Sequence, residues 1–168
     1  MKVKTKKSNW YLTFAMIGLL CLTGQMVMTA AGAGAPEKNA FTPDAIPYGP
    51  PPPFVPPGSQ LAVIEGNPAA ASGDYTVRLK MPDGYRIPPH WHPLRENVTV
   101  LSGTLKVGMG DRFDETAMAA FPAGSFAYLD PSMHHYAMAS GATVIQVHGM
   151  APLQFNYINP SDDPSRKK

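Results

Sequence analysis

The stretch 84–96 reads Gly-Tyr-Arg-Ile-Pro-Pro-His-Trp-His-Pro-Leu-Arg-Glu, and another glycine follows at Gly103. His90 and His92 are separated by one residue, and a β-strand directs two such side chains to the same face. Glu96 follows after a short interval, so a bend and a returning strand bring its carboxylate back beside the histidines. Two imidazoles and a carboxylate that converge on one point are typical ligands of a divalent metal.

This stretch resembles the first conserved motif of the cupin family at every fixed position. Gly84, His90, His92, Glu96 and Gly103 stand where that motif has its glycine, two histidines, glutamate and closing glycine. Cupins are double-stranded β-helices, also called jelly-roll barrels. The resemblance therefore implies an all-β fold of this class, formed by a single domain.

The second cupin motif supplies a third histidine from another strand. Residues 122–124, Pro-Ala-Gly, look like the turn of that motif, but its shortest form would place the histidine at Ala127. A longer variant of the motif matches residues 130–135 and implies His135 as the ligand, with His134 as the alternative one residue earlier.

The resemblance thus implies a mononuclear site formed by His90, His92, Glu96 and His135. Such a set suits one divalent transition metal ion, which can be iron, manganese, nickel, cobalt, copper or zinc. The sequence does not choose among these metals. Glu96 is the one ligand that can also move a proton, which makes it the candidate catalytic residue.

The first residues of the chain have the order of a secretory signal peptide. Four lysines lie within residues 1–7, an apolar run follows from Trp10 to about Leu22, and small residues occupy 30–35. This order predicts a signal peptide over residues 1–33 and a periplasmic or secreted protein. The apolar run is short for a bilayer, which needs about 20 residues, so we expect no stable membrane association after cleavage. An uncleaved anchor is the alternative.

The basic charge of the chain belongs to this leader. The whole sequence has 14 basic and 12 acidic residues, and the leader holds four lysines without any acid. The formal charge therefore changes from +2 to −2 on cleavage, which argues against a nucleic-acid partner. The only cysteine, Cys21, also lies in the leader, so the mature protein would contain no disulfide.

The rest of the chain is long enough for one domain. Residues 34–57 are rich in proline and favour an extended arm. Apolar residues in it, such as Ile46 and Phe54, indicate that the arm packs on the barrel or on a second subunit. The second alternative would make the protein a homodimer. Residues 58–158 form the expected barrel, and residues 159–168 a polar tail.

Alternating apolar and polar residues predict short strands separated by turns throughout the barrel. We expect turns at Ser102-Gly103 and Ser140-Gly141 among others. The expected strands are 61–65, 75–81, 87–92, 97–101, 104–109, 118–121, 125–129, 135–138, 143–148 and 155–158.

Four polar residues are candidates for the substrate pocket. Gln146 and His148 share one face of the last long strand and would reach the metal if that face looks inward. Tyr136 and Arg86 lie close to predicted ligands in the sequence. Three of them have a structural alternative: His148 as a hydrogen-bonded core histidine, Tyr136 as a packed tyrosine and Arg86 as a solvated arginine.

These features favour a small-molecule metalloenzyme, either an oxygenase, such as a dioxygenase, or an isomerase or lyase. Its substrate would be a small polar or acidic molecule. The alternative is a non-catalytic module that uses the metal to bind or sense a small-molecule ligand. Fold alone does not separate the two classes.

Overall fold

The computed structural model describes residues 39–166, so the predicted signal peptide lies outside the described residues. No helix in this part of the chain has the length and hydropathy needed to cross a membrane. The helices of the described part are short 3-10 turns: η1 (Pro43–Ala45), η2 (Glu115–Ala117), η3 (Pro160–Asp162) and η4 (Pro164–Arg166). The strands are β1 (Gln60–Gly66), β2 (Asp74–Met81), β3 (Arg86–Trp91), β4 (Glu96–Met109), β5 (Ala119–Pro122), β6 (Phe126–Leu129), β7 (His135–Met150) and β8 (Asn156–Tyr157).

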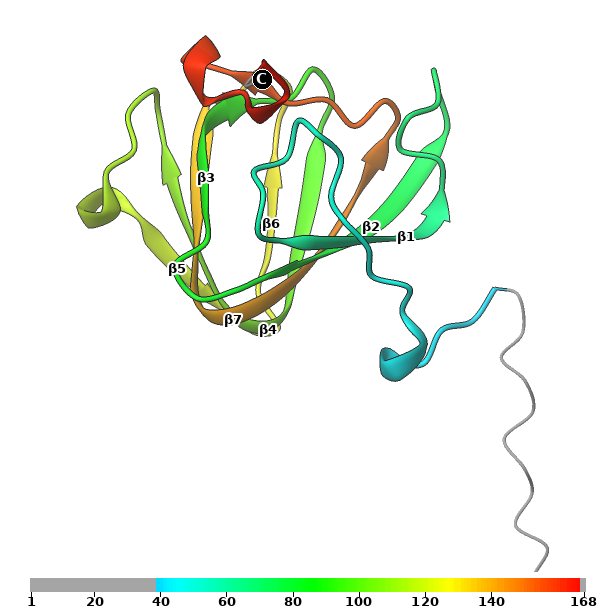
Figure 1. The fold of residues 1–168 in the computed structure, drawn as a ribbon. Helices are drawn as coiled ribbons and strands as arrows, with labels where there is room; N and C mark the ends of the chain where they lie inside the picture. Colours follow the sequence, from blue (N-terminus) through cyan, green and yellow to red (C-terminus); the bar gives the residue numbers. More distant parts are fainter. Residues whose placement is uncertain (1–38, 167–168) are drawn as a thin grey trace, which may run out of the picture. The chain divides into compact units, whose positions relative to one another are not determined.

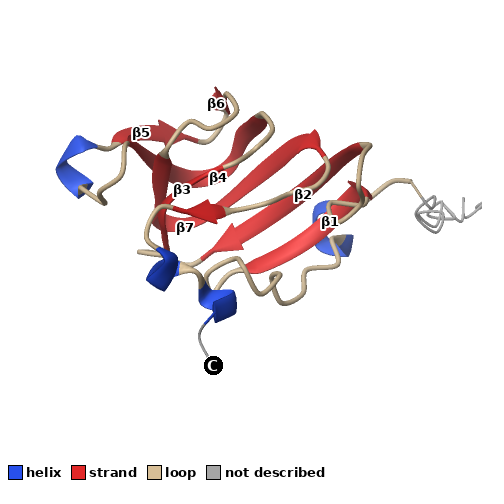
Figure 2. Ribbon diagram, turned by 90° about the horizontal axis from the view of Figure 1, so that it is seen from above, coloured by secondary structure: helices blue, strands red, loops and turns tan. Residues whose placement is uncertain are grey.

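Two long strands, β4 and β7, organise the barrel. They pair with each other along both of their halves, and Figure 1 shows them bending together at the lower end of the barrel. One layer runs β1, β2, the second half of β7, the first half of β4, and β6. The other runs β8, β3, the first half of β7, the second half of β4, and β5. All pairs are antiparallel, and the expected all-β double-stranded β-helix is confirmed (Figure 2).

The bends replace two of the turns that the sequence predicts. β4 continues through Ser102-Gly103 and β7 through Ser140-Gly141, and the register of their pairing shifts on either side of Ser102. Gly103 has a φ of 73°, which side chains other than glycine rarely adopt. A Cβ atom at Gly103 would also lie 2.6 Å from Thr143 Oγ1, so glycine is needed where the two strands bend past each other.

The proline-rich arm packs on the barrel of its own chain. Ile46 and Val55 are buried, as expected for an arm with apolar anchors. The Tyr157 hydroxyl donates a hydrogen bond to the carbonyl oxygen of Phe54 over 2.7 Å. The arm therefore covers one part of the barrel next to the C-terminal segment.

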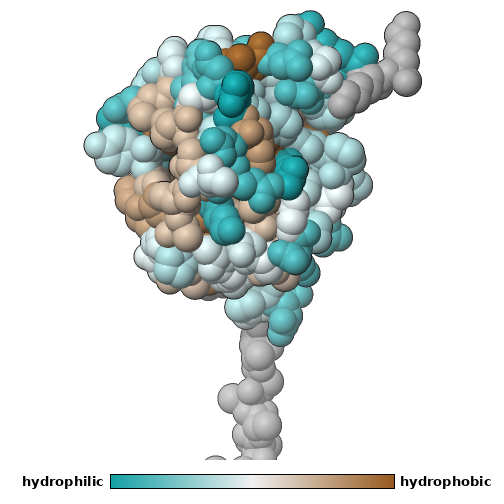
Figure 3. All heavy atoms as spheres, turned by 90° about the vertical axis from the view of Figure 1, so that its left-hand side faces the viewer, coloured by the Kyte–Doolittle hydropathy of each residue, from teal (hydrophilic) through white to brown (hydrophobic). Residues whose placement is uncertain are grey.

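Apolar side chains from both layers face the interior. The central ones are branched aliphatic residues on β2, β4 and β7, and they leave a cavity between them. The outer surface is mixed: Figure 3, viewed from the left-hand side of Figure 1, shows hydrophilic and hydrophobic residues side by side. Some of the residues that line this cavity also form the candidate site.

Candidate metal centre

The candidate ligands lie at strand ends that meet at one end of the barrel. His90 is close to the end of β3 and pairs with His135, the first residue of β7. His92 follows directly after β3, and Glu96 is the first residue of β4. One nitrogen of each of the three histidines lies within 4.8 Å of the other two, so the histidines are positioned to bind a metal ion.

Glu96 adds a carboxylate to the three imidazoles. Its Oε2 atom lies 3.5 Å from His92 Nε2 and 3.6 Å from His135 Nε2. Atoms that bind one tetrahedral ion at about 2.1 Å lie about 3.4 Å from one another, close to these separations. All four side chains are buried, with relative exposures between 2% and 8%.

The outer nitrogen of each histidine is hydrogen-bonded to the backbone. A carbonyl oxygen can only accept, so Nδ1 carries the proton and the neutral imidazole presents a lone pair on Nε2. This arrangement orients metal-binding histidines. The three bonds are His90 Nδ1 to Pro88 O at 2.7 Å, His92 Nδ1 to Gln154 O at 2.7 Å and His135 Nδ1 to Met133 O at 3.0 Å.

The inner side of the cluster therefore contains acceptors. His92 Nε2 is buried and has no hydrogen-bond partner within residues 39–166. A buried polar atom without a partner costs about 1–3 kcal/mol. A divalent cation would satisfy the three lone pairs, with the Glu96 carboxylate beside His92 and His135, so the residues present fit a metal ion.

The electrostatics favour the metal-binding protonation states of His90, His135 and Glu96: neutral imidazoles and an ionised carboxylate. Burial, with the neighbouring His135 and His92, holds the pKa of His90 well below its usual value. Burial also lowers the pKa of His135, and the opposing effect of Glu96 does not cancel it. Burial raises the pKa of Glu96, but His92 and His135 more than offset this and leave the pKa lowered.

His92 differs from the other two histidines. Burial lowers its pKa, but the Glu96 carboxylate and the carbonyl of Gln154 outweigh burial, and the pKa is raised. His92 is thus the histidine most strongly coupled to Glu96.

The structure brings His135 into the cluster and leaves His134 outside it. The His134 side chain is 39% exposed, and its Nδ1 lies 2.5 Å from Asp111 Oδ1. Adjacent residues of a strand point to opposite faces, so only one of the two can reach the other ligands.

Gln146 and His148 were candidates on the condition that their face of β7 looks inward, and the structure does not meet that condition. Ile145 and Val147 line the cavity, whereas His148 is exposed and Gln146 accepts a hydrogen bond from Arg78 Nε at 3.0 Å. The sequence predicts the alternation along β7. The barrel buries the face of β7 that carries the apolar side chains, because burying the other face would leave polar groups unpaired.

Tyr136 and Arg86 also lie outside the cavity. The Tyr136 hydroxyl donates a hydrogen bond to Asp114 O at 3.1 Å, and its ring packs against Phe113. Arg86 forms an exposed ion pair with Glu115. Tyr136 is therefore a packed tyrosine and Arg86 an exposed arginine, and neither is a pocket residue.

Phe155 is a site residue that the sequence does not reveal. Its ring stacks on the imidazole of His90, with centroids 4.5 Å apart and planes at 6°, and it meets His92 edge-on at 4.8 Å. A strand was predicted at 155–158, but the sequence contains no signal that places it against β3.

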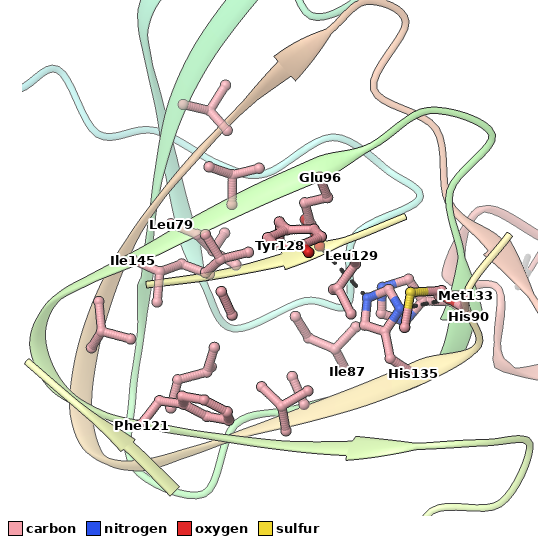
Figure 4. Close-up of a pocket in the computed structure, with 18 of the residues that line it drawn as sticks. Leu79, Ile87, His90, Glu96, Phe121, Tyr128, Leu129, Met133, His135 and Ile145 are labelled. Carbon is pink, nitrogen blue, oxygen red and sulfur yellow. Dashed lines mark hydrogen bonds and ion pairs between the residues drawn. The ribbon is translucent and has the colours of Figure 1, made fainter. Parts of the chain in front are cut away.

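Figure 4 shows the cavity side of the site. His90, Glu96 and His135 line the cavity, and Tyr128 and Met133 lie close to the same end. His92 is held from the opposite side by the segment around Gln154. A ligand in the cavity would approach a bound ion from the side lined by His90, Glu96 and His135.

Comparisons with known proteins agree with the fold. The chain resembles the polyketide cyclase RemF from Streptomyces resistomycificus over 75% of its own length and 89% of that chain, with a TM-score of 0.60 and 13% identity. It also resembles an RmlC-like cupin from Shewanella frigidimarina NCIMB 400 over 68% of its length and 91% of that chain, with a TM-score of 0.52 and 13% identity. These likenesses concern the fold.

The family model described as the ChrR cupin-like domain matches residues 38–154. The double-stranded β-helix and the histidine cluster define the class, and this match assigns the chain to the cupins with a ChrR cupin-like domain. A comparison with curated proteins gives no match.

Proposed function

We propose that the protein is an exported cupin that binds one divalent metal ion and acts on a small molecule as a metalloenzyme. The observation that carries this proposal is the set of three converging buried imidazoles, each held through Nδ1 by a carbonyl. The Glu96 carboxylate lies beside two of them, His92 and His135, and the cluster adjoins a cavity. A site that opens into a cavity is typical of catalytic metals, whereas structural sites are closed.

His90, His92, Glu96 and His135 would hold the ion. The bound ion would supply Lewis acidity and a point of attachment for oxygen atoms of a small molecule. The histidines have no free nitrogen for proton transfer, because each Nδ1 is bonded to the backbone. Glu96 therefore remains as the group that can accept or return a proton, at its carboxylate oxygens.

The reaction would be that of an oxygenase, including a dioxygenase, or of an isomerase or lyase. Oxygenases require dioxygen and the other two classes do not, so turnover with and without dioxygen separates them. Export is supported by the basic, apolar and small segments of residues 1–33. N-terminal sequencing of protein from the periplasm or medium tests it: a new start near Ala31 or Ala33 is expected, and an intact Met1 would contradict export.

The Glu96→Gln variant tests the catalytic proposal. Once a small-molecule screen of metal-loaded protein has found a substrate, this variant should retain the fold and much of the metal but lose turnover by about 10²- to 10⁴-fold. Glu115→Gln, which changes an exposed carboxylate paired with Arg86, is the control and should retain activity. Full activity of metal-loaded Glu96→Gln would remove Glu96 from the mechanism. Metal-loaded protein that binds small molecules but turns none over would instead support a binding or sensing module.

A further inference from the structure

The cavity beside the metal centre is strongly apolar. Its wall is formed mainly by aliphatic side chains from strands β2, β4 and β7. Apart from the candidate ligands, the polar side chains that line it in the described part of the chain are Ser125 and Tyr128. The central wall residues are Val77, Leu79, Val98, Val100, Ile145 and Val147.

The size of the cavity limits what it can hold. Its volume is about 240 Å³. An apolar protein cavity of about 150 Å³ accommodates benzene. Scaled from that case, the cavity has room for about ten non-hydrogen atoms, which corresponds to one substituted ring or a short branched chain.

The distribution of polar groups gives the ligand a direction. His90, Glu96 and His135 lie at one end of the cavity, so a donor atom of the ligand can meet the metal only there. A polar group elsewhere on the ligand, away from Ser125 and Tyr128, would be buried against aliphatic carbon without a partner, which weakens binding. Apolar surface of the ligand in the same place favours binding, because it is removed from water.

The solvent-exposed part of the cavity wall is also largely apolar. Three apolar side chains that line the cavity are also exposed to solvent, Met109 (50%), Phe126 (56%) and Met133 (38%), and so is the ring of Tyr128 (54%). The guanidinium of Arg95 lies 4.7 Å from the centre of the Tyr128 ring and is itself bonded to Asp130. Tyr128 is thereby held at the opening, and a ligand would pass apolar side chains on its way in.

We infer that the natural ligand has a compact apolar body of one ring or a short branched chain, and a single oxygen-donor head that binds the metal. This inference rests on the proposed metal site and replaces the small polar or acidic substrate expected from the sequence. Its acidic part, if present, is confined to the head.

Hydroxamates test the inference, because they share one metal-binding head and differ in the body. Protein loaded with Co(II), with its metal content measured first, would be titrated with benzohydroxamate, acetohydroxamate and aspartate β-hydroxamate. The visible spectrum of the metal and calorimetry would report binding. We expect benzohydroxamate to bind at least about tenfold more tightly than either of the others, from the apolar area that it buries. Equal or tighter binding of aspartate β-hydroxamate by metal-loaded protein would overturn the inference but leave the metal site intact.

A pair of variants locates the binding. Ala127→Leu adds side-chain volume at the cavity wall on β6 and should weaken benzohydroxamate much more than acetohydroxamate. Ala120→Leu makes the same change at an exposed position on β5 and should leave both unchanged. Equal effects of the two variants, at equal metal content, would contradict the assigned cavity. Protein that takes up no Co(II) would overturn the proposed function, and the inference with it.

Discussion

Phe155 lies flat against His90, with ring centroids 4.5 Å apart and planes inclined by 6°. The contact joins the C-terminal segment to the end of β3. The same segment supplies Gln154 O, which accepts a hydrogen bond from Nδ1 of His92. Figure 1 shows this segment passing over the end of the barrel beside β3. Two candidate ligands are therefore oriented by a part of the chain that carries no ligand itself.

Replacing the stacked ring should weaken metal binding without removing a ligand. Phe155→Leu should lower metal affinity by about 10- to 100-fold, as other changes behind metal-binding histidines do. Phe126→Leu shortens an exposed aromatic side chain at the cavity entrance and should leave metal affinity unchanged. Metal titration of both variants in competition with a chelator is the measurement. Equal affinities for the two variants would show that the stacking does not orient His90.

The two adjacent histidines should respond differently to substitution. His135→Ala removes a candidate ligand, so added metal should no longer raise the melting temperature, because stabilisation requires binding to the native state. His134→Ala removes only an exposed contact with Asp111 and should retain the metal-dependent rise. Thermal unfolding with and without metal distinguishes them. An exchange of these behaviours would make His134 the ligand.

Two glycines with the same backbone conformation should differ in their tolerance of alanine. Gly103 and Gly141 both have a φ of 73°, where alanine costs about 1–2 kcal/mol. Gly141 has open space around it, whereas a Cβ at Gly103 would lie 2.8 Å from Thr143 Cα. Thr143 is fully buried and donates to Thr104 O at 3.1 Å, so it has little room to move. Gly103→Ala should therefore lower the free energy of unfolding clearly more than Gly141→Ala in chemical denaturation; equal losses would rule out the steric explanation.

The protein should lose stability in alkali through its buried tyrosines. Burial raises the pKa of Tyr85, and burial together with nearby negative charges, including Asp163, raises that of Tyr157. Above pH 10 the unfolded chain releases these protons while the native state retains them, so stability falls as pH rises. The slope is at most about 1.4 kcal/mol per pH unit for each such tyrosine.

The Tyr157→Phe variant checks this origin. It loses the hydrogen bond to Phe54 O, a cost that is present at neutral pH, but the decline of stability above pH 10 should be shallower than in the wild type. Denaturant titrations over a series of alkaline pH values measure both slopes. Parallel curves would exclude Tyr157 as a source of the decline.

The local features of the fold and site were accessible from the sequence. The alternation of apolar residues predicts the strands, and the spacing of His90, His92 and Glu96 places these side chains at one point once a strand is assumed. The third histidine required the resemblance to a family, because it comes from a strand far along the chain.

The remaining features depend on long-range packing. Ser102-Gly103 has the composition of a turn, but pairing with β7 on both sides makes it a bend within one strand. The inward phase of β7 is decided by which side chains the second layer can bury, so Ile145 rather than Gln146 faces the cavity. The position of Phe155 follows from the pairing of β8 with β3, which no local pattern encodes.

Metal stoichiometry tests the central claim most directly. Metal-free protein would be dialysed against Zn(II), Co(II) or Fe(II) and analysed by elemental analysis, alongside His90→Ala and the control His134→Ala, with circular dichroism to verify the fold. The wild type and His134→Ala should each retain a single ion per chain, and folded His90→Ala should retain almost none, because it lacks one of the three converging imidazoles. Wild-type protein without bound metal, or His90→Ala that retains as much as the wild type, would contradict the assignment of this cluster as a metal centre.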